Sequence, residues 1–366
     1  MQETDALREA RHEMEVCNAC RYCEGFCAVF PAVNMRREFS AADLSYLANL
    51  CHNCRGCYYA CQYAPPHEWG INVPRTLARV RAASYAEHAW PPAMARAFER
   101  NGVLVAGAIA AGISLLLLLT LGLVPHAAMH GAHRVAPGAF YQVIPLWVMQ
   151  VVGLATFGFS VVAMAKGAVS FWRDAGTRQR IGPRAILAAL HDVTSLRNLG
   201  GGGGGCNDAS ERFSMRRRRL HHAMMYGFLL CFAATCTGFF YDSFLGWAAP
   251  YPFFSVPVVL GTLGGIGLLV GTGGLFAMKL VDNPEPAARE LLGADIALLG
   301  LLFLAAFTGL ALLALRGTAD MGVALAVHLG VILALFVTLP YSKMVHGVYR
   351  GLALLRAAVE QRAGVG

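Results

Sequence analysis

Six apolar stretches occupy most of the chain from Val103 onward, and they restrict the possible folds more than any other feature. Each has about 20 residues or more, the length that a helix needs to cross the hydrocarbon core of a bilayer. Because lipid cannot hydrogen-bond to the backbone, such stretches are stable in a membrane as helices. We therefore predict an all-α fold with a six-helix transmembrane bundle. The stretches run over residues 103–124, 141–165, 221–245, 253–278, 291–315 and from 321 past 339 toward 349.

Composition and charge also indicate a membrane protein. The chain is 56% hydrophobic and 14% charged, which is more apolar surface than a soluble fold can bury. Of its 30 Lys and Arg residues, all but Arg134 and Arg316 lie on the side of the predicted bundle that carries the N-terminus. The positive-inside rule then places both termini in the cytoplasm. The net charge of +8 is therefore explained by basic residues that gather on the cytoplasmic side of the membrane, and no nucleic-acid partner is expected.

Residues 1–100 form a separate predicted domain, because they are polar and rich in arginine. No export signal is expected at the N-terminus, so this domain is predicted to be cytoplasmic. We predict that it is compact and mostly helical, with its second helix started by Ser40 and Asp43. The predicted helices cover residues 4–15, 40–50 and 73–88.

Residues 101–366 form the predicted transmembrane domain, and its longest loop, on the cytoplasmic side, covers residues 166–219. This loop contains six consecutive glycines, Gly200 to Gly205, followed by Cys206. The glycine run lacks the flanking strand and the lysine of a phosphate-binding loop. We therefore predict a flexible linker.

Eight of the eleven cysteines form two runs with the same spacing, C-x2-C-x2-C-x3-C. Three thiolates at this spacing can bind three irons of one 4Fe–4S cluster, and in two-cluster ferredoxins the fourth cysteine binds the other cluster. Zinc sites and disulfides are the alternatives, but zinc sites usually use separated pairs of cysteines. The predicted ligands of cluster A are Cys17, Cys20, Cys23 and Cys61, and those of cluster B are Cys51, Cys54, Cys57 and Cys27.

One departure from the ferredoxin pattern concerns proline. Bacterial ferredoxins place a proline directly after the fourth cysteine of a run. Here Pro31 and Pro65 come four residues after Cys27 and Cys61. The turn that ends each run therefore differs from the ferredoxin turn.

Histidines in the apolar stretches are candidate ligands of a b-type haem, since ionisable side chains inside a membrane are costly and usually functional. His221 and His222 open the third stretch, whereas His328 and His346 are predicted to lie on the sixth, 18 residues apart on one helical face. The topology puts His346 at the depth of His221 or His222, so these residues are the predicted axial pair, with His221 preferred. His328 is a further candidate, with a hydrogen-bonded core histidine as the alternative.

The order of these features resembles the tricarballylate (or citrate) utilisation protein B family. The resemblance rests on the paired cysteine runs, the six apolar stretches and the segments HHAMMYGFLLCF at 221–232 and LPYSKMVHGVYR at 339–350. It extends to the segment from Asp192 to Phe228 that contains the glycine run. The resemblance implies a protein of the bacterial inner membrane that accepts electrons from an FAD-dependent tricarballylate dehydrogenase. It also implies transfer through two 4Fe–4S clusters and haem b to the quinone pool.

A wider similarity connects the chain with the haem subunit of membrane nitrate reductase and with heterodisulfide-reductase-like proteins. The 18-residue spacing of His328 and His346 matches one of the two histidine pairs of those two-haem subunits. Ten residues after His221, where the other pair would be completed, stands Cys231. A single haem is therefore expected, with a second haem bound by His328 as the alternative.

Two other functions are compatible with the sequence. The same groups could oxidise quinol and supply electrons to a cytoplasmic reductase of the heterodisulfide-reductase type. A redox-sensing membrane protein or a transporter belongs to a different class, but no broken-helix pair of a transporter is evident. The quinone site is not identified, and Tyr226, Lys343 and His191 are candidates by topology alone.

Overall fold

The computed structural model describes residues 4–97, 101–125, 129–131 and 135–363, and within these ranges it consists of helices and turns without a strand. Six helices are long and apolar enough to cross a membrane, which confirms the predicted fold class. Arg134, one of the two basic residues expected on the far side, lies outside the described residues. The six helices are α6 (Asn101–Leu123), α9 (Leu146–Ala175), α11 (Arg216–Leu245), α12 (Val256–Val281), α13 (Leu292–Leu315) and α14 (Met321–Thr338).

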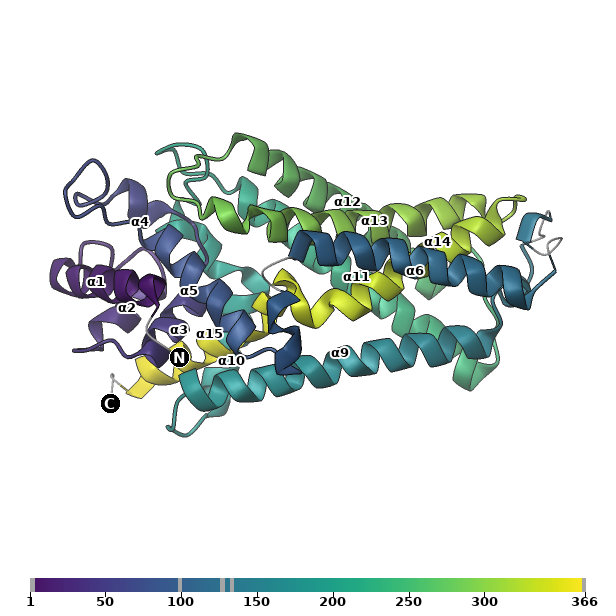
Figure 1. Cartoon of the computed structure of the whole chain (residues 1–366), viewed down its shortest axis with the longest axis horizontal. Helices are drawn as coiled ribbons and strands as arrows, with labels where there is room; N and C mark the ends of the chain where they lie inside the picture. The colour runs from purple at the N-terminus through teal and green to yellow at the C-terminus, as the bar shows by residue number, and fades with distance from the viewer. Residues whose placement is uncertain (1–3, 98–100, 126–128, 132–134, 364–366) are drawn as a thin grey trace.

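The N-terminal part packs at one end of this bundle, and both chain termini lie at the same end (Figure 1). Three of its helices, α1, α3 and α5, begin where a side chain caps the free N–H groups of the first turn. Ser40 accepts a hydrogen bond from the backbone of Asp43, as predicted, and Thr4 and Asn72 cap their helices in the same way. The five helices are α1 (Asp5–Cys20), α2 (Val29–Asn34), α3 (Ala41–Leu50), α4 (Gly56–Tyr59) and α5 (Val73–Glu87).

The C-terminal helix α15 (His346–Ala363) completes the core of the N-terminal part. Apolar residues of α15 and of the end of α9 belong to the same buried cluster as those of α1, α3 and α5. Two ion pairs reinforce the contact, because Arg36 binds Glu360 at 2.8 Å and Arg356 binds Asp43 at 3.0 Å. Residues more than 300 positions apart are thus held together around one hydrophobic core.

The sixth apolar stretch is not one helix, and this prediction was wrong. Helix α14 ends at Thr338, the chain turns through two short 3-10 segments (Leu339–Tyr341 and Lys343–Val345), and α15 begins at His346. Pro340 lacks a backbone N–H and cannot continue the hydrogen bonds of α14, and the extended backbone of Ser342 then turns the chain away from the helix axis. His328 and His346 therefore lie on different helices, and the predicted common face does not exist.

The loop at 166–219 is structured, so the prediction of a flexible linker was also wrong. Helix α9 continues to Ala175, and helix α10 (Pro183–Ser195) packs against α15. A 3-10 segment (Arg197–Gly203) leads into the glycine run, and Cys206 pairs with Ser214 through two backbone hydrogen bonds of 2.9 Å. The remaining short elements are 3-10 segments at Pro92–Ala97 and Arg289–Leu291 and helix α8 (Ala139–Val143).

Close packing of the membrane helices depends on glycine. Helix α6 crosses α14 where Gly112 faces Gly330, and a Cβ atom on Gly112 would lie 2.5 Å from the Gly330 carbonyl oxygen. Helices α11 and α12 approach in the same way at Gly227, where a Cβ atom would lie 2.6 Å from the backbone nitrogen of Leu268. Small residues at such crossings let membrane helices associate through backbone contact, because lipid provides no hydrophobic driving force.

The variant Gly112→Ala should destabilise the bundle, because the added methyl group meets backbone that cannot move alone. Overpacking of this kind costs about 1–3 kcal/mol. Thermal unfolding in detergent, followed by circular dichroism, should show a midpoint several degrees lower. Gly107→Ala on the same helix is the control, since nothing lies within 4 Å of its added Cβ. Equal midpoints for the two variants would contradict the role of the crossing.

Candidate functional site

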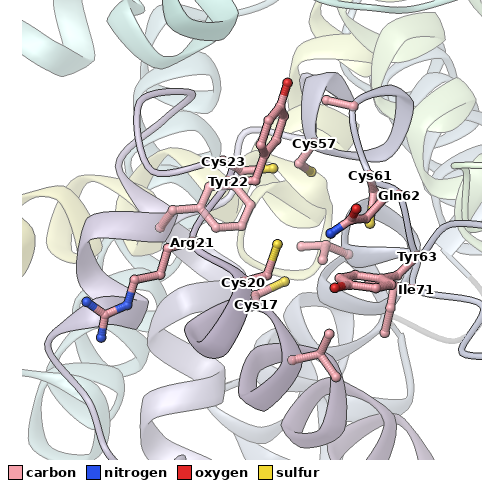
Figure 2. A pocket seen from close by; sticks show the side chains of 14 residues that line it. Cys17, Cys20, Arg21, Tyr22, Cys23, Cys57, Cys61, Gln62, Tyr63 and Ile71 are labelled. Carbon is pink, nitrogen blue, oxygen red and sulfur yellow. The ribbon is translucent and has the colours of Figure 1, made fainter.

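Four cysteines from both runs surround a cavity of about 270 Å³ near the surface of the N-terminal part. The first run contributes three of them, because α1 ends at Cys20 and the following turn carries Cys23. Figure 2 shows their sulfur atoms around one space, with Tyr22 and Arg21 at its edge. Tyr22 is 70% exposed, so this cavity lies close to solvent. The four are Cys17, Cys20, Cys23 and Cys61, and Cys57 lines the same cavity.

The other four cysteines gather deeper in the molecule. Cys51 and Cys54 are buried, and Cys27 of the first run lies with them beside Cys57. Burial raises the pKa of the Cys27 and Cys57 thiols well above the usual range, and neighbouring cysteines act in the same direction. Thiols in such a place bind as thiolates only when a cation compensates their charge. The structure thus brings Cys61 to the first group and Cys27 to the second.

A cap formed by residues 200–208 covers the deeper group. The backbone N–H of Asn207 donates a hydrogen bond of 2.9 Å to the Cys54 carbonyl, and fully buried Cys206 packs in a cluster with Cys54. Gly205 has a φ of +113°, and a Cβ atom there would lie 2.4 Å from the backbone of Ser214. The sequence analysis missed this cap. The available signal was Cys206, placed directly after the glycines.

Three arginines donate to backbone carbonyls of the loop that carries the second run. Arg81 and Arg350 donate to the carbonyl of Cys51 at 2.8 Å and 3.0 Å, and Arg217 donates to the carbonyl of Asn53 at 2.7 Å. Their positive charge lies around the deeper cysteine group. A nearby positive charge stabilises thiolates, so the site suits an anionic ligand set.

His221 of α11 and His346 of α15 face each other on the bundle side of the deeper cysteines. Their ring centres are 6.1 Å apart and the ring planes are nearly perpendicular. Nδ1 of His346 donates to the Lys343 carbonyl, which leaves Nε2 free to bind a metal. Nδ1 of His221 is buried without a hydrogen-bond partner. Two imidazoles that bind one metal ion through bonds of about 2 Å on opposite sides have ring centres about 6 Å apart, so the spacing of this pair is compatible with holding one metal ion.

His52 follows Cys51, lines the deeper cysteine cavity and lies close enough to His221 to interact with it electrostatically, and it was not singled out from the sequence. It is 7% exposed, and its Nδ1 hydrogen-bonds to the Leu50 carbonyl at 2.8 Å. Burial lowers the pKa of His52 well below its usual range, and Arg350 and His221 act in the same direction. Burial therefore favours the neutral form of His52, whose Nδ1 donates to the Leu50 carbonyl within the cysteine loop.

The other predicted histidines lie elsewhere. The ring of His222 packs on Tyr226, and His191 has a side chain that is 70% exposed beside Asp192. His328 on α14 hydrogen-bonds to the Thr308 hydroxyl at 3.0 Å, which is the alternative considered for it. Among the described residues, these three have no histidine facing them as His221 faces His346.

The variant Gly205→Ala should disrupt the cap, because neither the backbone conformation nor the space tolerates a side chain there. The purified protein should lose the iron of the deeper cysteine group, leaving about half of the wild-type iron and sulfide. Chemical iron and sulfide analysis measures this directly. Gly182→Ala in the same loop is the control, since its added Cβ meets nothing within 4 Å. Full iron content in the Gly205→Ala protein would show that the cap is dispensable.

Comparison with known proteins gave two family matches. A sequence model of the citrate utilization protein B family matches residues 99–365, and a model described as the citrate utilization protein B Fer4-like domain matches residues 10–87. The chain is also 47% identical to citrate utilization protein B of Escherichia coli over 364 residues, which cover 99% of this chain and 94% of that protein. No solved structure matches significantly.

Proposed function

Because the chain belongs to the citrate utilization protein B family, we propose that it is a membrane electron-transfer protein that reoxidises a reduced flavoprotein dehydrogenase and passes the electrons to quinone. The Fer4-like domain and the six apolar helices support an iron–sulfur protein of the membrane. The observation that carries the proposal is the order of the groups. The cysteine cavity near the surface, the buried cysteine group and the histidine pair follow one another toward the bundle.

Each cysteine group binds one 4Fe–4S cluster in this proposal. Three consecutive cysteines of each run bind one cluster, and Cys27 and Cys61 cross between the runs. The surface cluster receives electrons, because Tyr22 and Arg21 beside it are exposed to solvent. The deeper cluster is shielded by the cap and by α15, so that it exchanges electrons with the membrane part. Two clusters accept the two electrons of a reduced flavin one at a time.

His221 and His346 are the residues that would hold one haem b in this proposal, and the haem would supply a one-electron carrier near the deeper cysteine group. The chain contributes the orientation of both rings. The Lys343 carbonyl fixes the tautomer of His346, and burial keeps the pKa of this histidine well below its usual range, so that it is neutral and able to bind iron. Arg350 connects the two sites, because it donates to the Cys51 carbonyl and lies on the same helix as His346.

The partner is proposed to be an FAD-dependent dehydrogenase of the tricarballylate type, as the family resemblance of the sequence implies. It would dock at the end of the molecule that carries α1 to α5. The positive-inside rule places this end and both termini in the cytoplasm of a bacterial cell.

The function is tested by reducing the purified protein anaerobically and adding a short-chain quinone. Cluster and haem signals should be reoxidised by the quinone at a rate that depends on its concentration. In His346→Ala the haem absorption should disappear, because one axial ligand is lost, while the iron–sulfur signals stay. His191→Ala, with its exposed imidazole, is the control. A wild-type protein whose reduced clusters persist in the presence of quinone would refute the proposed function.

The crossed ligand pattern is tested by Cys61→Ser and Cys27→Ser, each serving as the control for the other. Cys61→Ser should impair the surface cluster and Cys27→Ser the deeper cluster, since each cysteine lies with the other run's group. Electron paramagnetic resonance of the reduced proteins should show loss of the coupling between two clusters in both variants. The remaining single-cluster signal should differ between them. Identical remaining signals would rule out the crossed assignment.

A further inference from the structure

A second cavity, of about 360 Å³, lies where the second cysteine run meets the near ends of α12 and α13. Its walls come from three parts of the chain that are far apart in sequence. Asn53 and Arg55 belong to the cysteine loop, Arg81 belongs to α5, and Leu280 and Leu292 belong to the ends of the membrane helices. The cavity therefore joins the cysteine loop to the apolar surface of the bundle.

Two lysines and one aspartate form the polar end of this cavity. Asp295 accepts from Lys279 at 2.7 Å and also binds Lys343, and its side chain is 12% exposed. Each ammonium group has three N–H donors, and one carboxylate cannot use them all. The group keeps a net positive charge and free donors, which suits a ligand with hydrogen-bond acceptors.

Three buried polar atoms in the cavity walls have no hydrogen-bond partner in the described structure. They are Oδ1 of Asn53, Nε of Arg55 and Oδ1 of Asp282. The side chain of Arg55 is 2% exposed, so bulk water does not solvate it. Buried polar groups almost always have partners, so the cavity is expected to hold water or a bound molecule that hydrogen-bonds to them.

The position of the cavity restricts the kind of molecule that can bind in it. Arg81, in its wall, donates to the carbonyl of Cys51, so the cavity borders the loop of the deeper cysteine group. At its other side Leu280, which is 72% exposed, lies at the end of a membrane helix. The occupant must reach the site from the bilayer, carry acceptor atoms and take up electrons. A soluble acid lacks the first property, and a phospholipid lacks the third.

We propose that this cavity is the site where the protein binds and reduces quinone, with Lys279 and Lys343 donating to the quinone carbonyl oxygen that faces the polar end and Asp295 positioning both lysines. The inference rests on the proposed function. One quinone takes up two electrons, delivered singly from the clusters and supplied by a reduced flavin, and two protons from water at the mouth of the cavity. The product is one quinol, whose new O–H bonds form at the two carbonyl oxygens.

The test uses the full-length protein in nanodiscs that contain phosphatidylglycerol. The protein is reduced anaerobically, and reoxidation is followed at several concentrations of a short-chain benzoquinone and a short-chain naphthoquinone. In Lys279→Gln the concentration for half-maximal rate should rise at least tenfold for the quinone that reacts, because one donor is lost. Cluster and haem spectra should stay as in the wild type. Asp295→Asn, a nearly isosteric change, serves as a second variant should Lys279→Gln fail to fold.

Arg173→Gln is the matched control, because it removes an exposed positive charge at the same end of the bundle away from the cavity. Unchanged quinone dependence in both cavity variants would overturn the site while leaving the function standing. Failure of either quinone to reoxidise the wild-type protein would instead overturn the function itself. Native mass spectrometry provides a further test, because it detects bound phosphatidylglycerol. Loss of bound phosphatidylglycerol from the variants with intact quinone kinetics would identify a lipid site and overturn the proposal.

Discussion

Three arginine side chains hold the loop of the second cysteine run, and the arrangement of the whole site depends on them. Arg81 from α5, Arg217 from α11 and Arg350 from α15 donate to two carbonyls of this loop. A hydrogen bond from a charged donor contributes about 1.5–3 kcal/mol, and a buried carbonyl without a donor is destabilising. Because the three helices come from different parts of the chain, these bonds position the N-terminal part, the membrane bundle and the C-terminal helix around one loop.

The difference in burial between the two cysteine groups gives the proposed electron path its direction. The surface group of cysteines lies between α1 and the turn after α4, next to exposed Tyr22. The deeper group is covered on one side by the glycine cap and on another by the helix that carries His346. The two groups have the same cysteine spacing but differ in burial. Burial and neighbouring charge determine the reduction potential of an iron–sulfur cluster. In the proposed path, the surface group therefore faces the soluble partner and the deeper group faces the membrane part.

Positive charge near the deeper group has a further consequence. Arg55, Arg217 and Asp208 form a buried network that ties the cap to the cysteine loop, since Arg55 donates to the Asp208 carbonyl at 2.7 Å and Arg217 binds its carboxylate at 3.2 Å. Removing one member of such a network leaves a buried charge without its partner. Arg55 of the cysteine loop lines the proposed quinone cavity and binds Asp208 of the cap, so these three parts are expected to fold as one unit with the bound clusters.

The sequence alone determined the class of fold and the chemistry of the cysteines, because both follow from local patterns. Apolar length predicts membrane helices, Ser40 three residues before Asp43 predicts a helix start, and the cysteine spacing predicts clusters. Pro340 also indicated a helix end in the sequence, but the apolar residues on both sides of it favoured the prediction of a single helix. Tertiary structure decided which histidine faces His346, since His221 and His222 are adjacent and only the packing of α11 orients them. It also decided that the glycine run covers Cys54 and that a cavity forms beside it, because these features depend on contacts between residues more than 100 positions apart, which no local pattern encodes.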